Sequence, residues 1–137
     1  MSARMGYAVM CDHALMDREG KHTLAGVFDR IFTRAIPGQH GRCWFVSEIR
    51  DLPGDHRFRL LVRDDHAKEI LPAVGPLRIQ CSPDYGSATV VVQIGALPLP
   101  VAGQYHFVVE VDGEEIGERV LYVHKGERKS PPDPTDA

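Results

Sequence analysis

Apolar and polar residues alternate along most of the chain, which is the two-residue period of β-strands with one buried face. The clearest stretch runs from residue 105 to residue 111, where every second residue is Tyr, Phe or Val. It ends in Asp112-Gly113, a dipeptide that favours a tight hairpin. We therefore expect residues 116–123 to return as its antiparallel partner.

The same period predicts further strands, separated by turns rich in Gly, Pro and Asp. Residues 23–33 are apolar on both faces, so we expect one central strand there. Trp44, the only tryptophan, is expected to anchor the core from a strand over residues 43–49. The other predicted strands cover residues 7–14, 58–62, 77–81 and 88–94.

Three connections are less regular. Residues 67–71 fit either a helical turn or the return arm of a hairpin. The turn SPDYG at 82–86 predicts that the strands on either side of it form a hairpin. The sequence LPLP at 97–100 disfavours regular ladder bonding, so we expect the chain to change sheet there.

About eight strands at this spacing, with no segment that demands a long helix, predict an all-β fold. We expect an antiparallel immunoglobulin-like sandwich of about 7–9 strands over residues 1–123. Residues 124–137 contain three prolines and no aromatic residue, so we expect a disordered tail there.

Length and charge narrow the classes of protein. A chain of 137 residues suits one core, and a net charge of -3 does not favour nucleic acid or anionic membranes as partners. The opening residues lack the apolar core of a signal peptide, and no apolar run is long enough to span a membrane. Cys11, Cys43 and Cys81 are odd in number and widely spaced, which favours buried free thiols over a disulfide framework, although one pair across the core stays open. We expect a cytoplasmic protein.

The stretch AGQYHF at 102–107 resembles the tyrosine corner of immunoglobulin-like domains. The resemblance implies that the Tyr105 hydroxyl bonds a backbone group a few residues upstream and that its ring packs against residues 97–100. Phe107 stands where antibody domains carry a cysteine. The role implied for Tyr105 is structural.

A larger part of the chain resembles a family of uncharacterised bacterial proteins of similar length. The resemblance covers residues 7–123 and rests on an opening like VMCDHALMDREGKHTLAGVFDRI and an ending like LPVAGQYHFVVEVDGEEIGER. It implies a single immunoglobulin-like sandwich and carries over no catalytic residue.

Candidate metal ligands are sparse. The seven histidines show no two at the short spacings that organise a zinc site. Asp64, Asp65 and His66 form the best local group, since two carboxylates and an imidazole could hold a divalent ion. A solvated turn at a strand end explains the same residues more simply, so we predict no metal or cofactor.

Candidate catalytic groups are equally isolated. Asp12 and His13 could pair with Asp29 on a neighbouring strand as an acid and a base, although such residues at strand ends more often face water. Ser87 in YGSAT lacks the second glycine of a nucleophile elbow, and no glycine-rich phosphate loop is present. We therefore predict no catalytic or cofactor-binding residue.

Arg57, Arg59 and Arg63 could form a basic strip for an anionic partner. A solvated face whose arginines pair with acidic residues of a neighbouring strand is the favoured interpretation. The acidic hairpin tip at 112–115 is likewise expected to be solvated, and its exposed charges should discourage edge pairing.

Three functional hypotheses follow. The first is a non-enzymatic binding or accessory module that presents loops or a sheet edge to another protein. The second is a small hydrolytic or metal-dependent enzyme, with Asp12, His13, Asp64, Asp65 and His66 as first suspects. The third is a structural subunit that self-associates through exposed strands such as residues 23–33.

Overall fold

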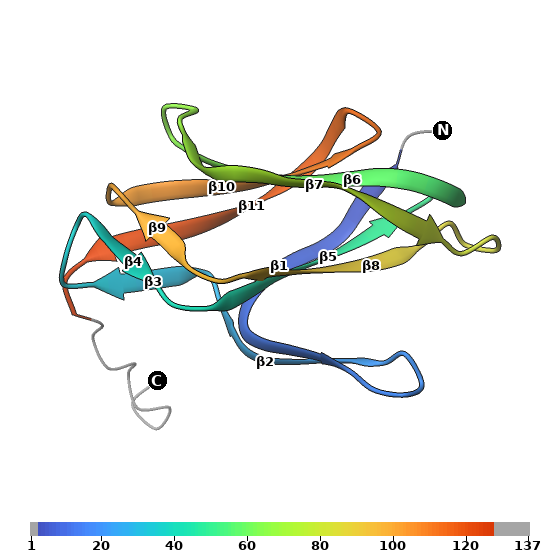
Figure 1. The fold of residues 1–137 in the computed structure, drawn as a ribbon, viewed down its shortest axis with the longest axis horizontal. Coiled ribbons are helices and arrows are strands. Elements are labelled where there is room, and N and C mark those ends of the chain that lie inside the picture. Colours follow the sequence, from blue (N-terminus) through green and yellow to red (C-terminus); the bar gives the residue numbers. More distant parts are fainter. Residues whose placement is uncertain (1–2, 128–137) are drawn as a thin grey trace, which may run out of the picture.

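The computed structural model describes residues 3–127, which form strands and turns without a helix (Figure 1). The strands are β1 (Arg4–Met16), β2 (His22–Phe28), β3 (Arg30–Thr33), β4 (Gly38–His40), β5 (Cys43–Arg50), β6 (Gly54–Asp64), β7 (Glu69–Cys81), β8 (Ala88–Ile94), β9 (Leu97–Leu99), β10 (Gly103–Val111) and β11 (Glu114–Lys125). The prediction of an all-β fold is confirmed. The number of strands exceeds the expected 7–9 because β3, β4 and β9 are short segments that the sequence pattern does not separate from turns.

Two sheets lie one above the other. One has the strand order β2-β1-β5-β8 and the other the order β3-β11-β10-β6-β7, while β4 and β9 form a small third sheet. All pairs are antiparallel except β3 and β11, which run parallel. Residues 3–127 contain no helix that is long and apolar enough to cross a membrane.

Apolar side chains from the two facing sheets fill the space between them. The rings of Phe45 from β5 and Phe107 from β10 stack with their centroids 5.7 Å apart, and both residues are fully buried. Period-two alternation puts Phe58, Leu60 and Val62 of β6 into the same cluster. The predicted buried face of β10 is also confirmed, because Tyr105, Phe107, Val109 and Val111 are all buried.

The prediction of one central strand over residues 23–33 is wrong. The chain leaves the four-stranded sheet after Phe28 and joins the five-stranded sheet at Arg30, so β2 and β3 are edge strands of different sheets. Gly26 adopts a φ of 69°, which disfavours a regular extended strand at that position. The segment looked apolar on both faces because its two halves face different surroundings.

Trp44 does not anchor the core between the sheets. It lies opposite Cys11 on the outer face of the four-stranded sheet and is half-buried, whereas its neighbour Phe45 points inward. Trp44 packs against a small outer cluster, to which Leu24 of the β1–β2 hairpin also belongs. The members of this outer cluster are Val9, Cys11, Ala14, Leu24, Trp44, Val46 and Val91.

The connections around β7 and β8 differ in part from expectation. Residues 69–71 begin β7, so the hairpin alternative for 67–71 holds and the helical one does not. The predicted hairpin across residues 82–86 is wrong, because β7 pairs with β6 while β8 pairs with β5 in the other sheet. The turn therefore carries the chain between sheets, closed by a bond from the Gly86 N–H to the Ser82 carbonyl at 2.8 Å.

The predicted change of sheet at residues 97–100 is confirmed, since β8 and β10 lie in different sheets. The chain nevertheless forms a three-residue strand there, β9, which pairs with β4 and buries Leu97 and Leu99 completely. Pro98 between them is exposed, which is compatible with a short edge strand.

The predicted hydroxyl bond of Tyr105 is present. Its Oη donates to the Val101 carbonyl at 2.6 Å and accepts from the Val101 N–H at 3.3 Å, and the ring is fully buried in the core that also contains Leu97 and Leu99. The hydroxyl thus fixes the turn that leads into β10.

The three cysteines are buried and free, and burial raises the pKa of the Cys43 thiol to about 11. The alternative of a disulfide across the core is therefore wrong. At the other end of the chain, β11 continues to Lys125, two residues into the segment predicted to be a disordered tail. Residues 128–137 of that segment lie outside the described residues.

Candidate functional site

A cavity opens at the side of the sandwich where the chain crosses from β2 to β3. The Asp29 carbonyl accepts a bond from the Tyr122 N–H at 2.9 Å, and β3 then pairs with β11 over residues 122–125. Earlier residues of β11 have no hydrogen-bonded strand on this side, because the pairing with β3 begins only at Tyr122. The side of the sandwich is therefore open beside Arg119.

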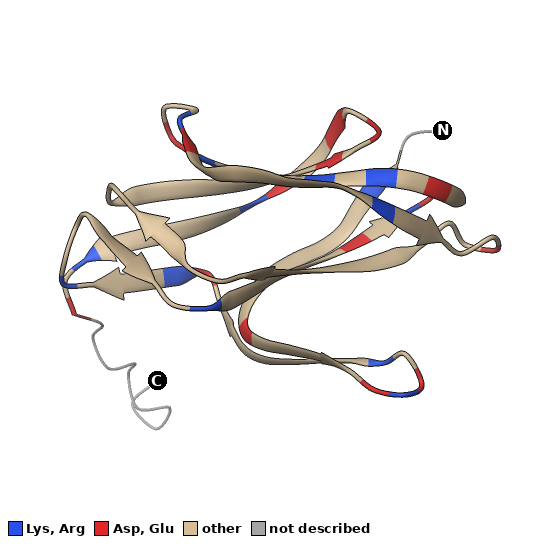
Figure 2. Ribbon diagram, viewed as in Figure 1, with Lys and Arg blue, Asp and Glu red and all other residues tan. Residues whose placement is uncertain are grey.

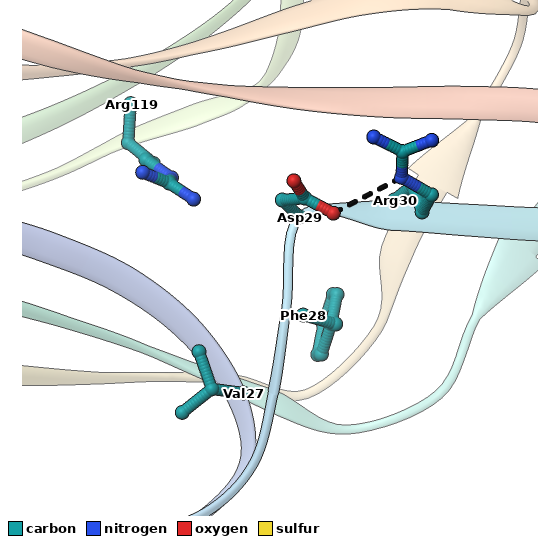
Figure 3. Close-up of a pocket in the computed structure, with 5 residues that line it drawn as sticks. All are labelled: Val27, Phe28, Asp29, Arg30 and Arg119. Carbon is teal, nitrogen blue, oxygen red and sulfur yellow. Dashed lines mark hydrogen bonds and ion pairs between the residues drawn. The ribbon is translucent and has the colours of Figure 1, made fainter. Parts of the chain in front are cut away.

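We call this opening the edge pocket, a cavity of about 320 Å³ lined by Val27, Phe28, Asp29, Arg30 and Arg119 (Figure 3). Arg119 reaches into it from β11, and Asp29 and Arg30 border its other side. The Arg30 Nε donates to Asp29 Oδ1 at 3.1 Å. This bond, with a smaller contribution from the charge of Arg119, lowers the pKa of the Asp29 carboxyl, so Asp29 is ionised at neutral pH.

Arg119 occupies an inward register. It lies opposite Phe107 in the β10–β11 ladder, and directly opposed residues of an antiparallel pair share a face. Its Nε is buried without a hydrogen-bond partner among the described residues. A buried donor left without a partner costs about 1–3 kcal/mol, and more when it belongs to a charged group. An acceptor that reached this N–H would remove the cost.

A second cavity, of about 270 Å³, lies beside the edge pocket and shares Phe28 and Arg30 with it. It is also lined by Asp12 and His40, and the His40 and Phe28 rings lie 5.5 Å apart. The Arg30 guanidinium in turn lies 5.7 Å from the centroid of the Tyr122 ring. Arg30 is thus held in place by Asp29 and Tyr122 together.

Strand β8 provides a different kind of surface, an open sheet edge. It ends the order β2-β1-β5-β8, so one side of its backbone has no neighbouring strand. Its seven residues, ATVVVQI, include no charged residue, glycine or proline, and Figure 2 shows no charged position along its ribbon. Natural edge strands are usually protected by charges, prolines, bulges or short length.

The other long edge strand shows such protection. β7 contains Pro72 and Pro76, and its pairing with β6 shifts register at three points. β2 contains Gly26, and β3 has four residues. Among the described strands, the β8 edge is therefore the one best suited to pair with an added strand.

The comparisons with known proteins bear on family and fold. Residues 6–124 match a family described as a family of unknown function, DUF6941. The chain belongs to this family. No curated protein matches the sequence. Among solved structures, the DUF6941 chain is similar to the alkylpurine DNA glycosylase AlkC of Pseudomonas fluorescens, described as bound to DNA containing an abasic site analog, at a TM-score of 0.50 and 8% identity. The match covers 85% of this chain and 30% of the glycosylase chain, and at this identity it bears on the fold alone.

The candidate metal ligands of this DUF6941 member do not converge. Asp64 Oδ1 accepts the N–H groups of His66 and Lys68 at 2.8 and 2.9 Å, so Asp64 belongs to a turn as predicted, but it is buried and not solvated. These two bonds lower the pKa of the Asp64 carboxyl, and the bond from Lys68 contributes most. Asp65 turns instead to His106, at 2.9 Å. Within residues 3–127, no three His, Cys, Asp or Glu side chains form a group that could hold a metal ion.

The proposed acid–base group does not assemble either. His13 pairs in register with Ala25, and Asp12 lies against Gly26, whereas Asp29 follows the end of β2 and bonds Arg30. No hydrogen bond or ion pair of the described chain joins Asp29 to Asp12 or His13. Ser87 bonds Ser82 through its N–H at 3.2 Å and so belongs to the turn before β8.

The arginines of β6 largely follow the favoured interpretation. Arg59 binds Glu110 and Arg63 binds Glu115, each at 3.1 Å from Nη1 to Oε1, across to β10 and β11. Arg57 remains exposed, and its N–H donates to Asp112 at 2.9 Å. Two of the three guanidinium groups are therefore neutralised by acidic neighbours.

Two histidines are held between acceptor atoms. In His106, Nε2 lies 2.9 Å from Asp65 and Nδ1 lies 3.4 Å from Glu118. In His56, Nε2 lies 2.9 Å from the Pro53 carbonyl and Nδ1 lies 2.6 Å from Asp112. Carboxylate and carbonyl oxygens only accept, so these contacts favour the charged ring, in which both nitrogens donate, over either neutral tautomer. The bond with Asp65 raises the pKa of His106, and the bond with Pro53 followed by that with Asp112 raises the pKa of His56.

These histidines predict that the protein is more stable at pH 6 than at pH 8. A group whose pKa is raised by folding stabilises the folded state fully below its unfolded pKa, near 6.5, and loses that effect as the pH rises through the folded pKa. We expect the free energy of unfolding to change less between pH 6 and pH 8 in the double variant His56→Gln/His106→Gln than in the wild type. Urea titrations at both pH values measure it, with His66→Gln as the control. An unchanged pH dependence in the double variant would contradict this account.

Sequence reasoning missed Arg119 and the β8 edge. A signal for Arg119 was available, since it shares the alternation of Leu121 and Val123 on the last strand. An arginine in an inward register is unusual and often marks a site. The β8 edge required the sheet order, which the local pattern does not contain.

Proposed function

We propose that this protein is a non-enzymatic binding module that pairs the open edge of β8 with an extended segment of another protein. Backbone N–H and C=O groups along such an edge supply the affinity, and side chains on the two faces supply the specificity. The observation that carries the proposal is the absence of any protective charge, glycine or proline over the seven residues of β8.

We further infer an immunoglobulin-like sandwich as its scaffold. Three features support this: two facing antiparallel sheets, a short strand β3 that runs parallel to the last strand, and the Tyr105 hydroxyl bonded to the backbone four residues upstream. The similarity to the glycosylase at a TM-score of 0.50 is compatible with a shared fold. Its DNA complex gives no support for DNA binding by this chain, whose net charge is -3.

The cellular setting is part of the same proposal. Three buried free thiols suit a reducing compartment, so we infer a cytoplasmic protein of a bacterium, as the family resemblance implies. The alternative of a hydrolytic or metal-dependent enzyme has less support, because its suspected residues lie apart. Self-association through the β8 edge is a second candidate, since an antiparallel edge can pair with its own copy.

The test places lysine on the β8 edge, as natural edges do. Thr89 and Gln93 lie outside the core clusters, so the double variant Thr89→Lys/Gln93→Lys is expected to fold. Thr23→Lys/Gln80→Lys adds the same charge at exposed positions of β2 and β7 and serves as the matched control. We expect proteins captured quantitatively from the native cell by the wild-type chain to be lost with the β8 variant and kept with the control.

The alternatives give different results. Loss of the captured proteins with the control but not with the β8 variant would overturn the proposal. A dimer of the purified wild-type chain in light scattering, converted to a monomer by the β8 variant alone, would favour self-association instead.

A further inference from the structure

We propose that the edge pocket binds a carboxylate group on a short aliphatic stem, with Arg119 as the principal donor. The pocket is separate from the β8 edge, because it lies beside β2, at the opposite end of the strand order β2-β1-β5-β8. The site therefore goes beyond the binding mode proposed above.

The Arg119 side chain leaves a buried donor unused. Its Nε is buried without a partner, and no ion pair joins it to a described residue. Four side-chain atoms of the described chain share this unpartnered state, and Arg119 Nε is the one that belongs to a permanently charged group lining a cavity. The N–H groups of a guanidinium form a planar fork that matches the two oxygens of a carboxylate.

The charges of the residues that line the edge pocket do not cancel. Two guanidinium groups, Arg30 and Arg119, face one ionised carboxylate, Asp29, which leaves one positive charge. A carboxylate monoanion brings the sum to zero. A phosphate monoester carries about −1.5 to −2 at neutral pH and would leave excess negative charge beside Asp29. The balance favours a carboxylate over a phosphate.

The edge pocket is small and has apolar as well as charged lining residues. Val27 and Phe28 give the pocket an apolar wall next to the charged groups, and Figure 3 shows Arg119 reaching toward that wall. A volume of about 320 Å³ is enough for a side chain but small for a larger cofactor. An aspartate or glutamate side chain of a partner and a small free carboxylic acid fit this description equally.

The test follows the arginine Nε–H signals of the ¹⁵N-labelled protein during titration with sodium propionate, at an ionic strength held constant with sodium chloride. We expect one Nε–H signal, absent in Arg119→Gln, to shift and saturate. Binding should weaken by about tenfold or more in Arg119→Gln, since a charge-assisted bond is lost. Arg63→Gln, which removes a guanidinium paired with Glu115, is the matched control and should bind as the wild type does.

Two further titrations sharpen the result. Inorganic phosphate should give no saturable shift of the same signal, and tighter binding of phosphate than of propionate would overturn the assignment to a carboxylate. The blocked tripeptide acetyl-Gly-Glu-Gly-amide identifies the source: tighter binding than propionate indicates a protein side chain, and equal binding indicates a free carboxylic acid. Absence of a saturable propionate shift in the folded wild type, or the same shift in folded Arg119→Gln monitored on backbone amides, would refute the site.

Discussion

Replacing Phe45 with alanine is expected to lower the free energy of unfolding by about 3–5 kcal/mol, because a fully buried aromatic side chain leaves a cavity that close-packed neighbours cannot fill. The loss includes the stacked contact with Phe107, whose ring centroid lies 5.7 Å away. The adjacent variant Trp44→Ala is expected to cost about 1–2 kcal/mol, since Trp44 is half-buried on the outer face.

Urea denaturation of the two alanine variants measures this difference directly. The contrast depends on strand alternation and not on side-chain size, because the larger residue is expected to matter less. A greater loss for Trp44→Ala than for Phe45→Ala would mean that β5 presents its other face to the core.

Replacing Tyr105 with alanine is expected to destabilise the fold by a similar amount, about 3–5 kcal/mol, because its ring is fully buried. The variant Tyr105→Phe keeps the ring and removes only the hydroxyl, which bonds both the N–H and the carbonyl of Val101. We expect it to cost about 1–2 kcal/mol. Val101 is 42% exposed, so water can bind the backbone groups that the hydroxyl releases.

Thermal and urea denaturation of the two Tyr105 variants separate the contribution of the ring from that of the hydroxyl. Should Tyr105→Phe prove as stable as the wild type, the hydroxyl would not hold the turn before β10. The inference of an immunoglobulin-like sandwich would then lose one of its three supports.

The parts of the fold that depend on local pattern could be predicted from the sequence. Alternation identified the buried face of β10, and Asp112-Gly113 identified the hairpin to β11, where both residues have positive φ values. The AGQYHF stretch identified the Tyr105 bond. In each case the pattern that predicts the feature is contained in one short stretch of sequence.

The parts of the fold that depend on the pairing of distant segments could not be predicted from the sequence. Residues 43–46 are apolar in succession, so alternation could not decide whether Trp44 or Phe45 faces inward. The division of residues 23–33 between two sheets depends on β11, nearly a hundred residues later. The edge pocket arises from the same long-range pairing, because Asp29 and Arg119 meet only when β3 docks on β11.

The candidate metal ligands likewise divide into residues with local contacts, which could be predicted, and residues with distant contacts, which could not. Asp64 was correctly assigned to a turn, because its bonds to His66 and Lys68 are local. Asp65 was grouped with it by sequence proximity, yet its partner is His106, on β10. Neighbouring residues at a strand end diverge when one closes the turn and the other reaches an adjacent strand.

The most direct test of the proposed function is hydrogen–deuterium exchange of the wild-type chain, alone and in complex with a protein that it captures. An added strand would bond the outward-facing amides of β8, so we predict slower exchange over residues 88–94 in the complex. Unchanged exchange in β8, with protection appearing elsewhere in the chain, would contradict the account.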